Sequence, residues 1–543
     1  MGAIPRHGFR SGIEPEDADM RWKMKLALSG TGMLFVSALL FVLLGCSTLP
    51  TRPVEPAVAA LPAGQDTRLD EVVQPALDAR PGQSGFHLVS DGVEAFALRG
   101  LSGRAAERSL DVQYYIWNDD LTGRLLALEL LDAADRGVRV RLLLDDMDAR
   151  AKNFAIAALA AHPNISVRLF NPFASRRGLF GKAMEAVTSF SRINHRMHNK
   201  SWIVDNRFAI AGGRNIGNEY FDASDHVNFN DLDLAFVGPA VEQLSASFDR
   251  YWNSEQVWPI ESLSPESVST GALDDLRSQL KAYEAQARET PYIKAMEGHD
   301  AIAAARAMAL PMHWTPRWQV LSDEPGKATH KDSPMEASAV LVGLTRAVDE
   351  AASEVVLISP YFVPGKEGAR LLLEQVEAGR EVRILTNSLA ANDVAAVHGG
   401  YSRYRKPLLE GGIALWELKP ERVADTGEDS GISLFGSSGG SLHSKAAVID
   451  NRVAFVGSFN LDPRSVSLNC EQGLLVDEPV IAAQVTALFQ RMTSPAAAWE
   501  VGLENGDLRW GDGRRSFEKE PGASLGRRFQ ARLARWLPVE PLL

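Results

Sequence analysis

From about residue 85 onward, short apolar runs alternate with amphipathic segments along the chain. Apolar runs over 111–117, 138–144 and 165–170 have strand-like composition, which predicts three strands. Between the first two runs, a helical spacing of apolar positions over 125–134 predicts a helix that ends by Gly137. Strands that alternate with helices indicate βαβ units. We therefore expect an α/β fold with mixed, mostly parallel sheets flanked by helices.

The same order of elements returns about 245 residues later in the chain. The matching runs are strand-like over 354–359, 381–385 and 413–417, and helical over 368–378. A constant offset across whole elements indicates a duplication. We therefore expect two homologous domains, over 85–260 and 336–495, packed against each other as a pseudo-dimer. The stretch between them, 261–335, is rich in alanine and charge and predicts a helical connector.

The N-terminal residues have the pattern of a secretory signal. Basic residues precede an apolar run over about 26–44, and Cys46 follows in the sequence Leu-Leu-Gly-Cys. We interpret 1–46 as an N-terminal extension with a lipoprotein-type signal peptide, in which Cys46 becomes lipidated and Met20 is an alternative start. An uncleaved membrane anchor is the other interpretation. The Pro- and Ala-rich segment 47–84 predicts a tether.

Two further segments have the composition of lipid-contacting surfaces. In the tail 496–543, helical spacing places five apolar residues on one face and four arginines elsewhere: Leu525, Phe529, Leu533, Trp536 and Leu537, with Arg527, Arg528, Arg532 and Arg535. A basic amphipathic helix that carries tryptophan suits a membrane surface, and packing onto its own domain is the alternative. The segment 173–190 mixes basic and apolar residues and is a candidate for the entrance of a site, with an ordinary helix cap as the alternative.

Composition narrows the possible partners. The chain has 543 residues and 45% hydrophobic residues, enough for two well-packed domains. Its net charge is −12, which argues against a general nucleic-acid binder. Its two cysteines, Cys46 and Cys470, rule out a disulfide framework. We therefore expect a membrane surface, and no nucleic acid, as partner.

One short polar pattern occurs once in each half. The pattern is a histidine, a lysine two residues later, an aspartate five after the lysine and an asparagine fifteen after it: His198, Lys200, Asp205 and Asn215, then His443, Lys445, Asp450 and Asn460. Residues two apart on a strand share a face, so each histidine and lysine should project together. Two copies predict a single site built from both halves. For Asp205 and Asp450 we favour a turn-stabilising role over a direct catalytic one.

This set of side chains suits chemistry on a phosphodiester. One imidazole attacks phosphorus and forms a covalent phospho-enzyme. The other protonates the leaving alkoxide and then deprotonates the incoming hydroxyl. The lysines and asparagines neutralise the phosphoryl oxygens, so no metal ion and no other cofactor is expected. We assign His198 as the nucleophile and His443 as the general acid and base.

A catalytic histidine also needs an acceptor for its second ring nitrogen. We expect Glu471 to serve His443, and Asp231 to serve His198 with Asp233 as its alternative. Ser458 should join the asparagines in binding phosphate, but the first half has Gly213 in the corresponding place, so the two halves are not equivalent. For Arg214, contact with a lipid headgroup and a plain salt bridge are both open.

The duplicated pattern resembles the signature of the phospholipase D superfamily, HxKxxxxD followed by a Gly-Ser-x-Asn-type element. The resemblance covers about 85–495. The stretches that resemble the bacterial cardiolipin synthase C branch are 110–117, 135–140, 196–200 and 212–217. This resemblance implies transfer of a phosphatidyl group to the glycerol hydroxyl of phosphatidylglycerol, which gives cardiolipin. It implies phospholipid substrates, namely phosphatidylglycerol with phosphatidylethanolamine as a second candidate, and a membrane-anchored protein at the periplasmic face of a bacterial envelope. An accessory protein is left open.

Three other functions compete with this interpretation. A phospholipase D hydrolase differs only in that water replaces glycerol in the second step. A nuclease fits the acidic net charge poorly. A lipoprotein that binds phospholipid without catalysis would have no use for two complete copies of the pattern.

Overall fold

A computed structural model describes the chain over 49–64, 66–149, 153–174, 194–263, 269–296, 298–306, 309–329, 338–392, 394–420 and 441–536. The described residues between 51 and 172 and between 194 and 536 belong to one compact unit. The predicted signal peptide with Cys46, and most of 173–190, lie outside the described residues. Across the described part of the chain, every helix is too short or too polar to cross a membrane.

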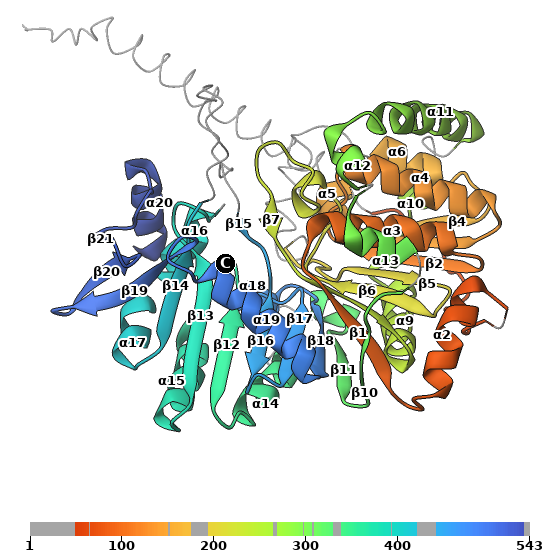
Figure 1. Cartoon of the computed structure of the whole chain (residues 1–543). Helices are drawn as coiled ribbons and strands as arrows, with labels where there is room; N and C mark the ends of the chain where they lie inside the picture. The colour runs from red at the N-terminus through yellow and green to blue at the C-terminus, as the bar shows by residue number, and fades with distance from the viewer. Residues whose placement is uncertain are drawn as a thin grey trace, which may run out of the picture. The chain divides into compact units, whose positions relative to one another are not determined.

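The first half is built on a nine-stranded sheet (Figure 1). Its strands, in spatial order, are β10 (His313–Thr315), β1 (Ser84–Val89), β8 (Asp233–Val237), β6 (Phe208–Gly212), β5 (Ser201–Val204), β2 (Ser109–Tyr114), β3 (Arg139–Asp145), β4 (Ile165–Phe170) and β9 (Val257–Pro259). The strands predicted over 111–117, 138–144 and 165–170 correspond to β2, β3 and β4.

The second half repeats this arrangement on a ten-stranded sheet. Its order is β11 (Trp318–Ser322), β18 (Gln472–Asp477), β17 (Val453–Gly457), β16 (Ala446–Ile449), β12 (Glu354–Ile358), β13 (Glu381–Asn387), β14 (Ala414–Leu418), β19 (Ala498–Glu504), β20 (Asp507–Gly511) and β21 (Ser516–Phe517). A two-stranded sheet joins the halves, because β7 (Phe229–Asn230) pairs with β15 (Ser441–Leu442).

The mixed α/β class with two repeats is confirmed, but the prediction that most strand pairs are parallel is wrong. In each sheet only the three strands joined through helices run parallel, β2-β3-β4 and β12-β13-β14. The other ladders of these two large sheets are antiparallel, including the β5-β6 and β16-β17 hairpins that follow the motif histidines. These hairpins turn at Asp205-Asn206 and Asp450-Asn451, all four with positive φ. A two-residue turn of this kind forces its strands to be antiparallel.

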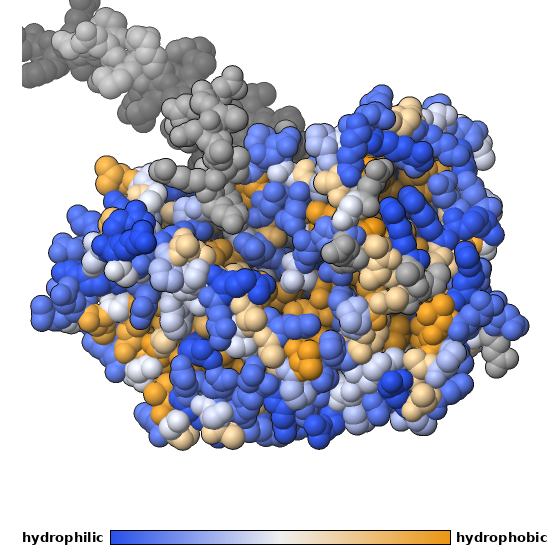
Figure 2. Space-filling view, in the orientation of Figure 1, coloured by the Kyte–Doolittle hydropathy of each residue, from blue (hydrophilic) through white to orange (hydrophobic). Residues whose placement is uncertain are grey.

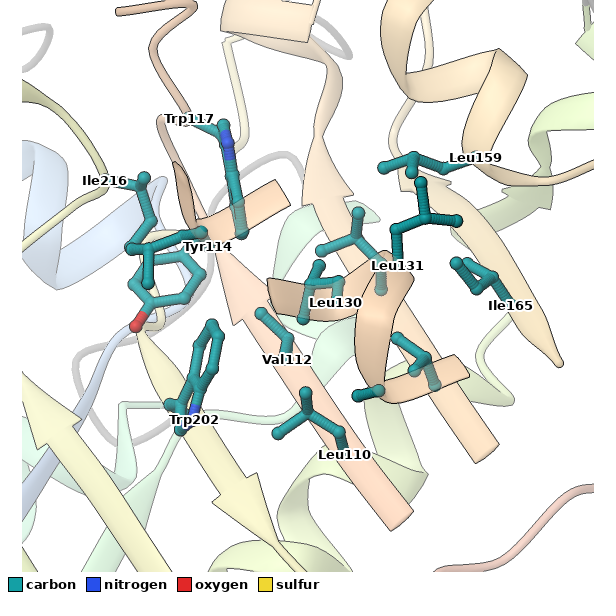
Figure 3. Packing of buried hydrophobic residues seen from close by; sticks show 14 of the residues in the cluster. Leu110, Val112, Tyr114, Trp117, Leu130, Leu131, Leu159, Ile165, Trp202 and Ile216 are labelled. Atoms are coloured by element: carbon teal, nitrogen blue, oxygen red, sulfur yellow. The ribbon is translucent and has the colours of Figure 1, made fainter. Parts of the chain in front are cut away.

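Helices flank both sheets, and two of them, α9 (Pro239–Trp252) and α19 (Pro479–Met492), lie in the core between the halves. In the first half these are α2 (Arg68–Asp78), α3 (Gly92–Ala105), α4 (Leu121–Asp135), α5 (Asp146–Ala149), α6 (Asn153–Leu159), η1 (Asn218–Tyr220) and α9 (Pro239–Trp252). In the second half they are α14 (Ala339–Asp349), α15 (Gly365–Glu377), α16 (Ala395–Tyr401), α17 (Arg405–Glu410), α18 (Pro463–Ser467), α19 (Pro479–Met492) and α20 (Leu525–Trp536). Figure 3 shows α4 side chains Leu130 and Leu131 packed over Leu110 and Val112 of β2.

The two halves share one hydrophobic core, as the pseudo-dimer prediction requires. It contains Ile203 and Phe236 of the first sheet together with Val448 and Leu474 of the second, all 0–1% exposed. Helices α9 and α19 contribute to the same core. Burial of this much apolar surface between the halves fixes their relative position within the compact unit.

The predicted tether over 47–84 is wrong for most of its length. The backbone of Val58 donates to the side chain of Asn253, and that of Ala60 donates to Asp249. Residues 68–78 form α2, which begins with a capping box in which Thr67 and Asp70 bond reciprocally. Composition indicated a flexible linker, but polar side chains of the first domain satisfy its backbone and hold it in place.

The connector and the tail also contain strands that were not predicted. The connector has the expected helices α10 (Ile260–Leu263), α11 (Thr270–Ala287), α12 (Pro291–Met296) and α13 (Asp300–Arg306). It then places β10 in the first sheet and β11 in the second, and continues into η3 (Pro325–Thr329). The tail adds β19, β20 and β21 to the second sheet before α20.

Candidate active site

Each motif histidine is held by backbone contacts with the opposite half. The N–H of His198 donates to the carbonyl of Cys470 at 2.8 Å, and the N–H of Cys470 donates to Arg196 at 2.8 Å. In the second half, the N–H groups of His443 and Ser444 both donate to the carbonyl of Asn230. The two contacts are related by the internal repeat. They bring segments that are far apart in the sequence to one place.

Within each half, the end of the third strand positions the residue before the histidine. The carboxylate of Asp145, the last residue of β3, accepts from the N–H of Met197 at 2.9 Å. The side chain of Asn387, the last residue of β13, bonds both the N–H and the carbonyl of Leu442 at 3.0 Å. The carboxyl ends of the parallel strands therefore position both histidines.

The histidines bond carboxylates from the opposite half, which corrects the predicted pairing. His198 Nδ1 lies 2.9 Å from Glu471 Oε2, and His443 Nδ1 lies 2.5 Å from Asp231 Oδ2. The two acceptors were identified correctly, but each was assigned to the wrong histidine. Asp233, the alternative to Asp231, instead pairs with Arg99. With Nδ1 bonded to a carboxylate, Nε2 of each ring is the nitrogen left for chemistry.

Both imidazoles are neutral near pH 7. Burial lowers the pKa of His198 well below its usual value, with a further contribution from Lys200 and Lys445. Burial and Lys445 lower the pKa of His443 to about 4, and Asp231 opposes this shift. Each histidine therefore feels both lysines. This places the two halves of the motif in one electrostatic environment.

The pKa values of the two carboxylates that bond the histidines are shifted in opposite directions. Burial would raise the pKa of Asp231, but His443, Lys445 and Arg214 together hold it below its usual value. Burial raises the pKa of Glu471, against the opposing effects of Lys200 and Ser458. The ionised Asp231 is thus the stronger partner for a histidine that must become protonated.

Each motif lysine bonds the backbone carbonyl of the histidine two residues before it. The Nζ of Lys200 donates to the carbonyl of His198, and the Nζ of Lys445 donates to that of His443. Burial lowers the pKa of Lys200 to about 7, with Lys445 adding to the shift and Glu471 opposing it. An anionic phosphate between the two lysines would stabilise their charged forms.

Of the three predicted phosphate ligands, two are engaged elsewhere. Ser458 Oγ donates to Glu471 Oε2 at 2.5 Å, so this hydroxyl holds the carboxylate that bonds His198. Asn215 accepts from the N–H of Ile116 at 3.1 Å and donates to Tyr220 at 3.0 Å. The buried Oδ1 of Asn460 accepts no hydrogen bond from the described residues. An amide oxygen does not bond a phosphoryl oxygen, so the phosphate-binding role of Asn460 stays a prediction that would use its Nδ2 donor.

The difference between Gly213 and Ser458 has a steric cause. A Cβ added to Gly213 would lie 2.2 Å from Asp231 Oδ1, closer than side chains approach one another. The first half uses the shorter aspartate and a glycine, whereas the second uses the longer glutamate and a serine. The two halves thus hold their carboxylates in different ways, which accounts for the missing hydroxyl.

Comparison with known proteins decides the family. A family model described as "Cardiolipin synthase, PLD-like domain" matches residues 104–252 and 344–493, which include both copies of the motif. The chain belongs to this family. The resemblance inferred from the duplicated motif is therefore confirmed.

Relatives extend this assignment over most of the chain. Cardiolipin synthase C of Escherichia coli (strain K12) is 41% identical over 482 residues, which cover 88% of this chain and 100% of that protein. Cardiolipin synthase A of Pseudomonas entomophila (strain L48) is 26% identical over 74% of this chain and 67% of its own length. The structure of a phosphatidylserine synthase from Haemophilus influenzae Rd KW20 superposes with a TM-score of 0.55 at 13% identity, covering 87% of this chain and 100% of that one. This last likeness concerns the fold.

Several residues that contact the family motif were not predicted from the sequence. Tyr115 presents its ring to His198 with 5.1 Å between centroids, and Tyr220 does the same to His443 at 5.2 Å. From the connector, Asp323 accepts from the N–H of Glu471 and from Lys327, which fixes the backbone of that glutamate. Tyr115 lies in the stretch 110–117 that carried the family resemblance, directly after β2, whereas the connector gave no signal because its role depends on tertiary contacts.

Arg214 is a structural residue. It is 1% exposed and donates to the carbonyls of Val89, Ser90 and Tyr220. Of the two interpretations left open, the salt bridge is the one observed, because Arg214 lies 3.5 Å from Asp233. Among the described residues, no group of three or more His, Cys, Asp or Glu side chains is placed to hold a metal ion.

Asp205 and Asp450 link strands, and we correct their place among the predicted catalytic residues. Asp205 accepts from three consecutive backbone N–H groups at the start of β2, those of residues 107–109, at 2.8–3.0 Å. Asp450 bonds residues 352–354 at the start of β12 in the same way. Both carboxylates are occupied, and the turn-stabilising role fits them.

We expect Asp205→Ala to lower the free energy of unfolding and to leave the chemistry intact. Removal of the carboxylate leaves three N–H groups unpaired, that of Ser109 buried and the other two partly buried, which costs about 2–4 kcal/mol. Asp450→Ala is the matched control, and it should cost less because two of its donor residues are exposed. Chemical denaturation measures the loss, and kcat of the folded fraction should stay within a few-fold of the unsubstituted protein. A large fall in kcat without loss of stability would return Asp205 to the catalytic residues.

Proposed function

We propose that the protein is a phosphatidyltransferase that makes cardiolipin through a phosphohistidine intermediate. The observation that carries the proposal is the pair of crossed dyads, His198-Glu471 and His443-Asp231, beside two buried lysines. The relation to cardiolipin synthase C of Escherichia coli over that protein's whole length supports the choice of substrate. Phosphatidylglycerol is the proposed donor and acceptor, with phosphatidylethanolamine as a second candidate donor.

In the first step, Nε2 of His198 attacks the phosphorus of the donor lipid. The P–N bond forms as the bond from phosphorus to the headgroup oxygen breaks, and the protonated form of His443 transfers its Nε2 proton to the departing alkoxide and becomes neutral. Lys200, Lys445 and Asn460 stabilise the charge on the other phosphoryl oxygens. His198 suits this role because burial lowers its pKa and keeps the ring neutral.

In the second step, the glycerol hydroxyl of a phosphatidylglycerol attacks the phosphohistidine. His443 now accepts the hydroxyl proton, the P–N bond breaks and the product is cardiolipin. The ionised Asp231 stabilises the imidazolium that His443 becomes. The same residues would give phosphatidic acid if water took the place of the lipid hydroxyl.

We further propose that the protein acts at the periplasmic face of a bacterial envelope membrane, anchored through the N-terminal segment with Cys46. The apolar run before Cys46 and the phospholipid chemistry of the site support this location. A partner protein is not required by the chemistry proposed for the site.

The test of the proposed function is a product assay. The full-length protein in vesicles that contain phosphatidylglycerol is expected to release glycerol and form cardiolipin, both identified by mass. Phosphatidic acid as the main product would show a hydrolase instead. Turnover that persists in His198→Ala combined with His443→Ala would show that the site has another role.

A further inference from the structure

The C-terminal helix α20 packs on the second domain through its small residues. Ala531 and Ala534 are buried against α16. A Cβ added to Gly399 of α16 would lie 2.5 Å from the carbonyl of Ala531 and 3.0 Å from Cβ of Ala534, so the two helices are in close contact. Arg527 anchors the helix further by donating to the carbonyls of Leu389 and Asn392.

The large apolar residues of α20 point away from this contact. Leu525, Phe529, Leu533 and Trp536 are 81%, 68%, 50% and 82% exposed. Their spacing of four, four and three residues puts them in one stripe, on the side of the helix opposite Ala531 and Ala534. The other exposed large apolar residues in the described part of the chain are valines: Val54, Val72, Val342, Val394 and Val480. Both interpretations of this helix therefore hold in part, since it packs on its own domain and still presents an apolar face.

The charge of α20 is opposite to that of the chain. The helix carries four arginines and no acidic residue, although the chain as a whole has a net charge of −12. Arg532 and Arg535 are exposed, with Arg532 next to the apolar stripe and Arg535 farther round the helix on the same side. In Figure 2, hydrophobic and strongly hydrophilic residues adjoin at the end of the second domain where Figure 1 shows α20. An apolar stripe bordered by arginines matches the surface of an anionic lipid bilayer.

The contacts of α20 connect it with the active site. The loop that accepts from Arg527 also contains Ala391, whose carbonyl accepts from Ser441 Oγ in β15. His443 follows two residues after Ser441. If α20 binds a lipid surface, these contacts therefore hold the motif of the second half near the membrane.

We propose that the exposed face of α20 docks on an anionic phospholipid surface and presents the active site to lipid. The proposal rests on the proposed function, because a phospholipid substrate is what makes this position useful. A second copy of the chain, or one of its own segments outside the described residues, is the competing occupant of the face.

The test uses the full-length protein in vesicles, with an environment-sensitive label on Phe529→Cys. Lipidated Cys46 carries no free thiol, and Cys470 is buried. The matched control carries the label on Val342→Cys, an exposed apolar position of α14. Quenching by lipid with spin-labelled acyl chains should be at least about three-fold stronger at Phe529→Cys, since apolar faces of such helices lie about 5–10 Å below the headgroups. Replacement of Arg532 and Arg535 by glutamine should weaken docking about five-fold per residue in phosphatidylglycerol vesicles.

The outcomes separate docking from catalysis. Equal quenching at the two positions in vesicles where cardiolipin is formed would overturn the docking proposal and leave the function intact. Strong quenching at Phe529→Cys without any lipid product would overturn the function and leave docking intact. Protection of the label from aqueous iodide in the absence of lipid, or disulfide-linked dimers through Phe529→Cys, would show that protein covers the face and would also overturn docking. The His198→Ala chain should give the same quenching as the active protein.

Discussion

Replacement of His198 by alanine is expected to abolish phosphatidyl transfer from every donor, whereas replacement of His443 should spare donors that have a good leaving group. The nucleophile is needed whatever the headgroup, so His198→Ala should lower kcat by about 10⁴-fold or more. An acid is needed only where the leaving alkoxide is basic. His443→Ala should therefore lose about 10²–10⁴-fold on phosphatidylglycerol and far less on a p-nitrophenyl ester of phosphatidic acid.

The measurement is the burst of p-nitrophenolate on mixing enzyme with the aryl ester. His443→Ala should release about one equivalent and then turn over slowly, because the same residue must activate the incoming hydroxyl. His198→Ala should show no burst, and the exposed His226→Ala provides a control with unchanged kinetics. A burst from His198→Ala with none from His443→Ala would exchange the two roles. Equal loss of the burst in both variants would contradict the assignment of different roles to the two histidines.

The local spacing of the motif was sufficient to locate both histidines and both lysines. Each histidine lies three residues before a short strand that is packed inside its sheet, and the lysine lies between them, directly before the strand. The aspartate turns, Asp205 and Asp450, were also interpreted correctly, because a polar residue between two apolar strands is typical of a hairpin. These features depend on neighbours along the chain, so the sequence alone contains them.

The crossed dyads could not be predicted in the same way. His198 and Glu471 are 273 residues apart, and their contact depends on the pairing of Met197 with Cys470 between the two halves. The docked segment before α2 is a similar case, since its Pro- and Ala-rich composition contains no sign of the side chains at the end of α9, Asp249 and its C-cap Asn253, that bond its backbone. Contacts between elements decide both features. A repeat offset shows that the halves correspond, but it does not show which half supplies a given partner.

Replacement of the two carboxylates tests the crossed pairing directly. Asp231→Asn should behave like a variant of His443, and Glu471→Gln should behave like a variant of His198. In each case we expect kcat to fall by about 10²–10⁴-fold, because an amide removes the charge and can select the wrong imidazole tautomer. The aryl ester separates the two, since only the Asp231→Asn deficit should be largely relieved by a good leaving group. Pairing within each half predicts the opposite assignment.

The pH dependence gives the same comparison an independent readout. Asp231 opposes the burial and the Lys445 charge that lower the pKa of His443 to about 4, so its removal should lower that pKa further. The acid form of His443 is then scarcer at every pH above its pKa, and the rate on phosphatidylglycerol should recover only as the pH falls. Glu471→Gln should leave unchanged the pH range in which the rate falls as His443 loses its proton. If Glu471→Gln, and not Asp231→Asn, shifted this pH range, His443 would pair with the carboxylate of its own half. The arrangement of the shared site would then differ from the crossed pairs described above.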